Sequence, residues 1–585
     1  MNDAVKAIRT YFEEFWFVVG DAGRDLPRVF GLFVFAAGLD IVGLSLFVPL
    51  VMSLNSGTPG SDAPDGFFGA KLMQGSAALT LCAVAAIAVF AGRALVAVYV
   101  QSQIVKFGEC HRARLMERLM RAYLDKPYEF HLQRNSADLA NTVQGLTGLY
   151  VGGTLILALR LATEILSFAA IVTFLAFTNL PVLLVTTFFL GASLTVYLAK
   201  VQKVVARAGA QSAQSAGEVI KTVNHGLGAL REIRLLGRED FLLRELRRHA
   251  EALADSQARF GALQTIPRLL LETTLISLLS LLAVLAADSP GLQASVVPTL
   301  GVFAVASLRL LPGATTMAGA VNSMRNGRYI LGRLAADLRE LDATATRARS
   351  TLPQTTAKFA SLELRNISYR YPGAAQPALR GLNFSICAGE AVGIIGRSGS
   401  GKSTFADLCL GLLAPQEGEV LVDGRPLAAD ACGWMRHVAY IPQSIFLFDD
   451  TLLRNITLED RPDRVDHARL DRVLKAALLD EIVTALPAGL ETFMGERGVR
   501  LSGGQRQRVA LARALYFDRE FIVMDEATSA LDNETERELV RAIHALHGQR
   551  TLLVIAHRSA ALEGCDRILT MDGGRLNSVD LESGS

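Results

Sequence analysis

Few residues of this chain are charged. Only 20% of its 585 residues are Asp, Glu, Lys or Arg, whereas 51% are hydrophobic, and the mean hydropathy is +0.31. A soluble protein of this composition would expose large apolar patches to water, so we infer that much of the chain faces lipid. The net charge of +2 is an average over a membrane part and a soluble part, so it argues neither for nor against acidic partners. We expect no nucleic-acid partner.

Cysteine is also scarce, and the chain contains no internal repeat and no low-complexity tract. The six cysteines include no CxxC pair and show none of the spacings of zinc or iron–sulfur sites. We expect them to be small buried hydrophobic residues that form no structural disulfide. They are Cys82, Cys110, Cys387, Cys409, Cys432 and Cys565.

A small-residue cleavage site is missing from the first 26 residues, so they are not predicted to be a signal peptide. Phe12, Phe15, Trp16 and Val19 recur at helical spacing. This pattern predicts an interfacial helix that lies on the membrane. A plain surface helix is the alternative.

Long hydrophobic runs, in contrast, are abundant. A helix needs about 20 apolar residues to span a bilayer, and six segments reach that length. They cover residues 27–54, 77–105, 148–178, 181–205, 262–287 and 292–317. Lys and Arg concentrate between the second and third spans and between the fourth and fifth, so these connections and both termini are predicted to be cytoplasmic. Both connections keep a helical pattern far beyond the bilayer, and breaks at 126–127 and 224–226 predict a short transverse helix at each tip.

The composition changes after Ala348. A polar linker is followed by short β-branched runs that alternate with helical stretches, which is typical of an α/β domain. We therefore predict a multidomain chain, with an all-α transmembrane domain of six helices and an α/β domain. The expected parts are an N-terminal interfacial helix at 1–26, the transmembrane domain at 27–345, a linker at 346–358 and the α/β domain at 359–585.

A glycine-rich loop follows a predicted strand at 392–395. It matches the P-loop pattern in the strand-to-helix context that this pattern requires. The loop consists of Gly396, Arg397, Ser398, Gly399, Ser400, Gly401, Lys402, Ser403 and Thr404. Backbone N–H groups of such a loop hold phosphate oxygens at the positive end of the next helix. Lys402 is predicted to reach the β and γ phosphates and Ser403 to bind Mg²⁺, so ATP and Mg²⁺ are the expected cofactors.

A second apolar strand, at 521–526, ends in two carboxylates. Side chains alternate along a strand, so Asp525 and Glu526 point differently and can have separate roles. We predict that Asp525 holds Mg²⁺ and that Glu526 is the general base that polarises the attacking water. An apolar strand ending in Asp-Glu is commonplace by itself, and it gains its meaning from the P-loop nearby.

Residues 501–508, Leu-Ser-Gly-Gly-Gln-Arg-Gln-Arg, resemble the signature sequence of ABC ATPases. The other motifs of that family follow in the family's order, and each would be ordinary structure if it stood alone. They are Tyr371, similar to the A-loop aromatic that stacks on adenine; Gln443, similar to the Q-loop residue near Mg²⁺; 529–532, similar to the D-loop; and His557, similar to the catalytic switch histidine.

This resemblance implies that one copy cannot form a complete site. In ABC ATPases the signature of one copy contacts the ATP held by the other, which assigns Ser502, Gly503, Gly504 and Gln505 to a neighbour's nucleotide. A homodimer is therefore expected, and pairing with a different half-transporter is the alternative. Six spans, long cytoplasmic projections and a C-terminal ATPase resemble type IV exporters, with Glu496 similar to their segment that contacts the membrane domain. The implied location is the bacterial inner membrane, with the nucleotide-binding domain in the cytoplasm.

Charged residues inside the spans mark either a transport pathway or a structural pair. Away from the cytoplasmic ends of the helices, they are Asp40, Arg93, Arg160, Glu164, Glu272 and Arg309. Arg93, Glu164, Glu272 and Arg309 all fall about 14 to 17 residues from the predicted outer ends of their helices, or roughly 21–26 Å. This depth predicts one layer in the inner leaflet. The layer either holds acids and arginines that neutralise each other or lines a cavity for an anionic headgroup.

The substrate is the least determined feature. Segments 128–137, 231–239 and 308–312 resemble bacterial flippases for lipid-linked oligosaccharides, and a guanidinium such as that of Arg309 suits a pyrophosphate. We therefore predict ATP-driven flipping or export of an amphipathic, anionic lipid. A multidrug or peptide exporter is the alternative, and a membrane-anchored ABC ATPase that acts as a regulator is the third candidate.

Overall fold

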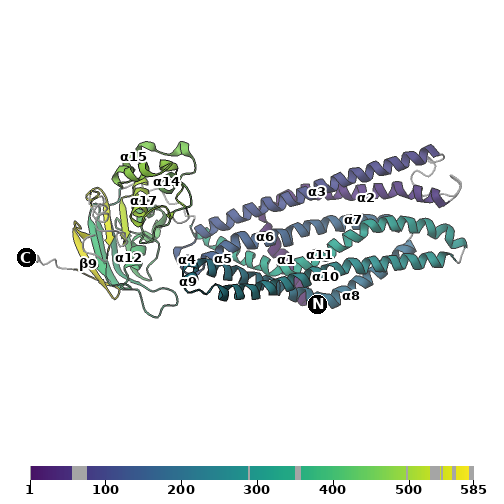
Figure 1. Cartoon of the computed structure of the whole chain (residues 1–585), viewed down its shortest axis with the longest axis horizontal. Helices are drawn as coiled ribbons and strands as arrows, with labels where there is room; N and C mark the ends of the chain where they lie inside the picture. The colour runs from purple at the N-terminus through teal and green to yellow at the C-terminus, as the bar shows by residue number, and fades with distance from the viewer. Residues whose placement is uncertain are drawn as a thin grey trace, which may run out of the picture. The chain divides into compact units, whose positions relative to one another are not determined.

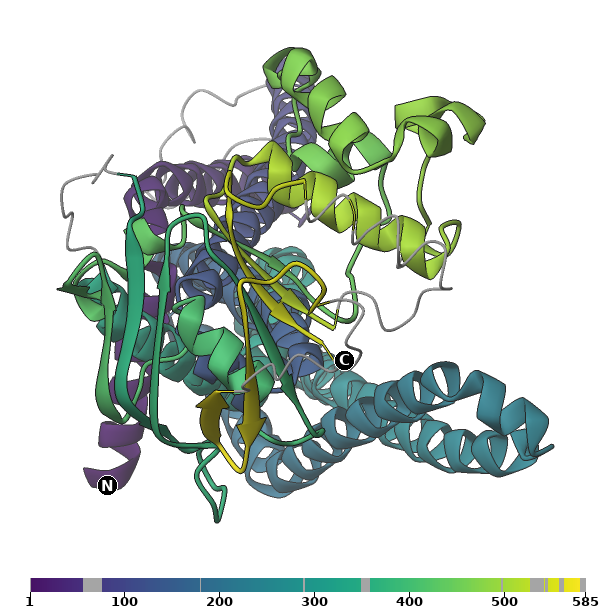
Figure 2. The ribbon, with the colours of Figure 1, turned by 90° about the vertical axis from the view of Figure 1, so that its left-hand side faces the viewer.

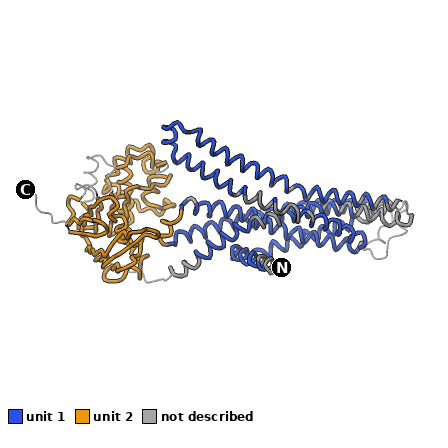
Figure 3. The backbone as a smooth tube through the Cα atoms, turned by 90° about the horizontal axis from the view of Figure 1, so that it is seen from below, with its two compact units in different colours: residues 1–126, 135–348 blue, residues 127–134, 349–585 orange. Residues whose placement is uncertain are grey.

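The computed structural model describes residues 2–55, 76–178, 180–287, 290–348, 358–495, 498–526, 541, 545–556 and 562–578. The predicted Glu496, D-loop and His557 lie outside these residues. The chain divides into two compact units, coloured separately in Figure 3. Unit 1 contains residues 1–126 and 135–348, and unit 2 contains 127–134 and 349–585.

Unit 1 is built of long helices that run side by side (Figure 1). Their bounds are α1 (Asn2–Val19), η1 (Gly20–Asp25), α2 (Leu26–Asn55), α3 (Ser76–Leu124), α5 (Ser136–Asn141), η3 (Thr142–Leu146), α6 (Thr147–Tyr150), η4 (Val151–Leu155), α7 (Ile156–Thr178), α8 (Leu180–Gly228), α9 (Leu230–Leu235), α10 (Glu239–Ala287) and α11 (Pro290–Ala348). Figure 2 shows α8 and α10 as a pair, one part of which extends away from the other long helices, and α10 also packs against α11. The segments η3 and η4 are π-helical turns, which often mark functional regions of a helix.

Three helical segments of the described residues are long and apolar enough to cross a membrane. They are Ala22–Leu46, Ala83–Leu124 and Asp138–Phe177. The first part of α8, Leu180–Ser193, is a shorter apolar segment. The six predicted spans fall on long helices of unit 1, and their number as membrane crossings stays a prediction.

The short helices α4 and α9 follow the predicted breaks. α3 ends at Leu124, and α4 (Tyr128–Gln133) begins directly after Pro127, which cannot donate a backbone hydrogen bond. The second break was placed too early, because α8 continues to Gly228 before α9 begins. Isolated glycine and asparagine residues therefore did not end this helix.

Unit 2 contains two sheets. The first is antiparallel, in the order β2-β1-β4-β5, and the second has the order β10-β9-β3-β8-β7-β6 with parallel pairing from β9 to β6. The strands are β1 (Ser361–Tyr369), β2 (Leu379–Cys387), β3 (Ala391–Gly396), β4 (Glu417–Val422), β5 (Arg425–Pro426), β6 (Val438–Ile441), β7 (Phe521–Asp525), β8 (Thr551–Ile555), β9 (Arg567–Asp572) and β10 (Arg575–Ser578). The helices beside α4 are α12 (Lys402–Cys409), α13 (Ala431–Trp434), α14 (Leu452–Thr457), α15 (His467–Ala476), α16 (Asp480–Ala485) and α17 (Gly503–Tyr516).

Strand β7, which lies between β8 and the edge strand β6, shows why the two carboxylates lie at the carboxyl end of the sheet. All five of its residues are buried, as expected for a parallel strand covered on both faces. Ile522 and Met524 pack into one hydrophobic cluster, whereas Phe521 and Val523 pack into the cluster on the opposite face. This alternation leaves Asp525 and Glu526 at the carboxyl end of the strand. The predicted architecture, a domain of long helices followed by an α/β domain, is observed.

The cysteine prediction was wrong in part. Cys409 is buried, but Cys110, Cys387 and Cys432 are exposed in the single chain. Cys387 ends β2 on the face opposite Ile386, so the alternation of the strand places it in solvent. Residue type alone does not determine which face a position occupies.

Candidate nucleotide-binding site

The P-loop joins β3 to α12 through glycines that no other residue replaces without strain. Gly399 and Gly401 have φ angles of +79° and +109°. A side chain at Gly396 would place its Cβ 2.4 Å from the Met571 carbonyl oxygen. The loop is therefore shaped by its glycines, and its backbone amides lie at the start of α12.

Lys402 closes over this loop. Its side chain is buried, and its Nζ donates to the carbonyl oxygens of Gly396 at 2.9 Å and Arg397 at 3.1 Å. The ammonium is thus held against the loop in which phosphates are predicted to bind. Ser400 is also buried in the loop, and its hydroxyl lies 2.8 Å from the position of a Cβ at Gly396.

The structure brings together the two predicted Mg²⁺ ligands. Ser403 Oγ donates to Asp525 Oδ2 at 3.2 Å, and the hydroxyl of Tyr440 donates to the same oxygen at 3.3 Å. Burial raises the pKa of Asp525, the bond from Ser403 opposes this, and the neighbouring Glu526 adds to it. A buried carboxylate beside a hydroxyl provides the oxygen ligands that Mg²⁺ requires, so these residues fit the ion.

The predicted general base is held by the Q-loop residue. Gln443 Nε2 donates to Glu526 Oε2 at 2.6 Å. Glu526 has a φ of +49°, which is uncommon for a residue with a side chain and occurs often at functional sites. Its backbone N–H donates to the Ile555 carbonyl of β8 at 2.8 Å, which anchors this backbone conformation.

The A-loop tyrosine lies beside the P-loop helix. The hydroxyls of Tyr371 and Thr404 are 3.1 Å apart. Asp407, one turn after Ser403 in α12, is half-buried. Burial raises the pKa values of Tyr371 and Tyr440, and the charge of Asp407 adds to both increases. Burial and then Asp525 raise the pKa of Asp407 to about 6.

Sequence reasoning missed Tyr440 and Asp407. A signal for Asp407 was available, because residues four apart share a helix face and Ser403 was already assigned. Nothing in the local sequence pointed to Tyr440, since β6 becomes a neighbour of β7 only through the fold.

The signature residues form the start of α17. Ser502 and Gln505 make a capping box, in which the Gln505 N–H donates to Ser502 Oγ at 3.3 Å and the Ser502 N–H donates to Gln505 Oε1 at 2.9 Å. Gly503 and Gly504 are the first residues of the helix. Their predicted contact with the ATP of a second copy stays a prediction, as do the roles of the undescribed residues.

Two of the predicted intramembrane charges are paired within the protein, and their common depth stays a prediction. Arg93 Nε donates to Asp40 Oδ1 at 2.7 Å, and the Ser167 hydroxyl donates to the other oxygen of Asp40 at 2.9 Å. Glu272 is instead paired with Arg268, one turn away on α10, at 2.7 Å. Arg309 lies on α11, and its side chain is outside the described set.

Two of the predicted residues, Arg93 and Glu164, share a cavity of about 420 Å³ in unit 1. Gln101, Arg160 and Thr163 also line it. The sequence had marked Arg160 as an intramembrane charge without placing it near the others. Its Nε is buried and has no hydrogen-bond partner among the residues that the structure describes.

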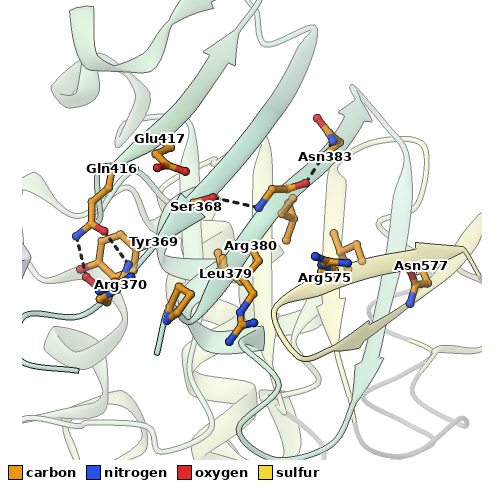
Figure 4. Close-up of a pocket in the computed structure, with 14 residues that line it drawn as sticks. Ser368, Tyr369, Arg370, Leu379, Arg380, Asn383, Gln416, Glu417, Arg575 and Asn577 are labelled. Atoms are coloured by element: carbon orange, nitrogen blue, oxygen red, sulfur yellow. Dashed lines mark hydrogen bonds between the residues drawn. The ribbon is translucent and has the colours of Figure 1, made fainter. Parts of the chain in front are cut away.

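A second cavity, of about 550 Å³, lies in unit 2 on the strands beyond the A-loop (Figure 4). Arg370, Arg380 and Arg575 contribute to its walls. Neither the described P-loop residues nor those of the 521–526 strand line it. The cavity therefore does not belong to the predicted phosphate site.

Comparison with known proteins identifies both units. A family model described as ABC transporter matches residues 379–529, and one described as ABC transporter transmembrane region matches residues 29–265. An ATP-dependent lipid A-core flippase of Cupriavidus metallidurans is 31% identical over 80% of this chain and 77% of the relative. The flippase of the same description from Cupriavidus pinatubonensis is 30% identical over 87% of this chain and 85% of the relative.

The solved structure of a bacterial Atm1-family ABC exporter with ATP bound has the same fold. It covers 95% of this chain and 95% of its own, with a TM-score of 0.77 and 23% sequence identity. The family resemblance noted in the sequence is confirmed. The long alignments and the two family models show that this chain belongs to the ABC transporter family, as a transmembrane region followed by an ATP-binding ATPase domain that drives transport.

Proposed function

We propose that this chain works as a homodimer in the bacterial inner membrane, where it uses ATP hydrolysis to flip an anionic lipid such as a lipid-linked oligosaccharide. The proposal of an anionic lipid substrate rests on the charged cavity of unit 1. Guanidinium groups in a cavity among membrane helices suit a phosphate-bearing headgroup. The relatives named ATP-dependent lipid A-core flippases support a lipid substrate.

Arg160 is the stronger anion anchor of this cavity. Arg93 already donates to the buried Asp40, so its charge is largely neutralised, whereas Arg160 has a buried Nε without a partner among the described residues. Arg309 remains a second proposed anchor, because of its predicted depth in the inner leaflet and because segment 308–312 resembles flippases. Glu164 supplies an acceptor for hydroxyl or amino groups, which a sugar-bearing headgroup would offer. Glu272 pairs on its own helix, and we assign it a scaffold role.

For hydrolysis, we propose that the P-loop amides and Lys402 bind the phosphates. Ser403 and Asp525, with Gln443 nearby, would hold Mg²⁺, which neutralises phosphate charge. Glu526 would accept the proton of the attacking water, and the Gln443 amide that bonds its carboxylate would keep it oriented. His557 and the signature of a second copy would complete the site.

Exposed apolar surface supports the second copy. Leu235 and Leu236 at the end of α9 are 82% and 72% exposed, which is unusual for leucine at a cytoplasmic tip. On unit 2, the nucleotide unit, Phe446 and Phe448 next to the Q-loop are 60% and 51% exposed. We propose that these surfaces are covered when two chains associate.

The cavity also bears on the two alternative functions, a multidrug or peptide exporter and a regulatory ATPase. A multidrug exporter needs no fixed charge in its cavity, whereas the described cavity contains two arginines and a glutamate among its apolar residues. A regulatory ATPase would need no cavity among its membrane helices. The charged cavity therefore favours the flippase.

Reconstituted full-length protein tests the proposal. In proteoliposomes that contain a fluorescent lipid with a pyrophosphate headgroup, Mg-ATP should increase the rate at which the lipid changes leaflet. The matched controls are a zwitterionic lipid with the same acyl chains and the variant Arg268→Gln, which removes an arginine outside the cavity, for comparison with Arg160→Gln. Equal movement of both lipids, or no loss in Arg160→Gln, would overturn the anionic substrate class.

A further inference from the structure

A short helix that follows a membrane helix in sequence belongs to the nucleotide unit. α4 begins at Tyr128, shortly after α3 ends at Leu124. Residues Pro127–Arg134 nevertheless form one compact unit with 349–585 (Figure 3). The contacts of α4 with the nucleotide domain are therefore part of that domain's own packing.

One residue of α4 bonds a buried tyrosine. Tyr369, the last residue of β1, is 0% exposed, and its hydroxyl donates to Glu129 Oε1 at 2.9 Å. A hydrogen bond to a carboxylate is roughly twice as strong as a neutral one. Because this hydroxyl is buried, removal of Glu129 takes away its acceptor.

Tyr369 in turn contacts the A-loop tyrosine. The rings of Tyr369 and Tyr371 meet edge to face, with centroids 5.1 Å apart and planes at 89°. The residue between them, Arg370, is fixed by both polar atoms of the Gln416 amide: its N–H donates to Oε1 at 3.1 Å, and its carbonyl accepts from Nε2 at 2.8 Å (Figure 4). The two tyrosines are thus joined by ring packing and by a clamped backbone.

The far end of Tyr371 is fixed as well, because its hydroxyl lies 3.1 Å from Thr404 Oγ1 in α12. The chain of contacts therefore runs from Glu129 through Tyr369 and Tyr371 to the residue that follows Ser403. The hydrolytic residues Asp525 and Glu526 have separate partners. A change at Glu129 should consequently reach the nucleotide base before it reaches the reacting phosphate.

We propose that Glu129 is a positioning residue for the adenine base of ATP and that it acts through Tyr369 on Tyr371. This inference rests on the proposed role of Tyr371 in stacking on adenine. It makes the segment that leaves the membrane domain a determinant of ATP affinity.

Steady-state ATPase measurements on the full-length protein in lipid nanodiscs test this role. Glu129→Ala and Tyr369→Phe should each raise KM for ATP by about twofold to tenfold, the range for weakening one aromatic contact, while kcat stays nearly constant. Inhibition by Mg-tripolyphosphate, which has no base, should not change. Glu129→Gln keeps an acceptor oxygen and should restore most of the affinity, and the double variant should be no weaker than either single variant.

Three outcomes would overturn the proposal. A lower kcat at constant KM would show that Glu129 serves only to hold α4. Unchanged kinetics in Glu129→Ala and Tyr369→Phe, with a raised KM in Tyr371→Ala, would sink the relay and leave the base site intact. An unchanged KM in Tyr371→Ala would remove the base assignment itself. Equal melting temperatures establish that the variants fold.

Discussion

The two units of this chain use apolar side chains in opposite ways. In β7 of the nucleotide unit every residue is buried, whereas Leu81, Leu95 and Val98 of α3 are 70%, 74% and 70% exposed. The nucleotide unit hides its apolar surface from water, and α3 presents the same residue types outwards because lipid is its solvent. Exposure in the single chain therefore has a different meaning in each unit.

The two units also differ in the partners that they give to a buried carboxylate. Asp40 of unit 1 is satisfied inside the protein by Arg93 and Ser167. Asp525 of unit 2 accepts only from hydroxyl groups among the described residues, and its pKa is raised by burial. A carboxylate with a fixed cation partner serves as scaffold, whereas one that lacks such a partner is suited to receive a metal ion.

The largest effect is expected at the general base. Glu526→Gln should lower kcat by about 100-fold or more, because the carboxylate that accepts the proton is lost. ATP binding should survive and stabilise a closed dimer, which size-exclusion chromatography with ATP can detect. Phosphate release measures kcat.

Lys402→Ala is the matched comparison for this variant. It removes phosphate contacts, so nucleotide binding itself should weaken. Hydrolysis by Glu526→Gln at the parent rate would show that another residue is the base.

Breaking the buried pair of unit 1 should reduce stability most. Asp40→Asn leaves the Arg93 guanidinium, which is 20% exposed, without its partner, at a cost of about 3–5 kcal/mol. The melting temperature of the solubilised protein reports this loss, and a second change, Arg93→Gln, should recover part of it. Glu272→Gln is the control, because its partner Arg268 is 70% exposed and surface pairs contribute about 1 kcal/mol or less. Equal losses in both variants would remove the distinction between the two pairs.

Arg309→Gln distinguishes a transport charge from a scaffold charge. If Arg309 contacts the headgroup, substrate affinity should fall about tenfold or more, since hydrogen bonds to charged groups contribute roughly 1.5–3 kcal/mol. Substrate-stimulated ATPase activity should then be lost, with basal activity and melting temperature unchanged. A large fall in melting temperature with stimulation preserved would establish Arg309 as scaffold.

The smallest effect concerns Asp407. Its pKa in the folded state is about 6 against 3.8 in the unfolded chain, so between these pH values the native state holds a proton that the unfolded state lacks. Stability should therefore fall as the pH rises through this window. Asp407→Asn should flatten this dependence and raise the free energy of unfolding of the nucleotide unit at pH 7 by about 1 kcal/mol.

Urea unfolding without nucleotide, at pH values from 4 to 7, measures the effect. Asp463→Asn, on an exposed surface pair, should leave the curve unchanged. An equal pH slope in the parent and in Asp407→Asn would show that Asp407 does not titrate differently in the two states.

Sequence reasoning succeeded where the functional atoms are neighbours along the chain. The P-loop could be predicted because strand, loop and helix are contiguous, and Lys402 and Ser403 follow from the pattern. The charges of unit 1 could be identified but not paired, because depth along a helix does not say which way a side chain points. Glu272 therefore turned out to pair with Arg268 on its own helix, and Arg93 with Asp40 on another. Such choices depend on helix rotation and packing, which the sequence pattern does not determine.

The inclusion of α4 in the nucleotide unit affects how this ATPase can be studied. A fragment that begins at residue 359 would carry every motif of the ATPase yet lack Glu129, which precedes it by more than 200 positions in the sequence. The hydroxyl of Tyr369 would then bond to water in place of Glu129, and the contact that orders this tyrosine would be lost. Nucleotide affinities measured on such a soluble fragment would describe an incompletely assembled domain, and biosensors or inhibitor screens built on it would inherit that defect. Supplying residues 127–134 as a tethered peptide would restore the missing acceptor.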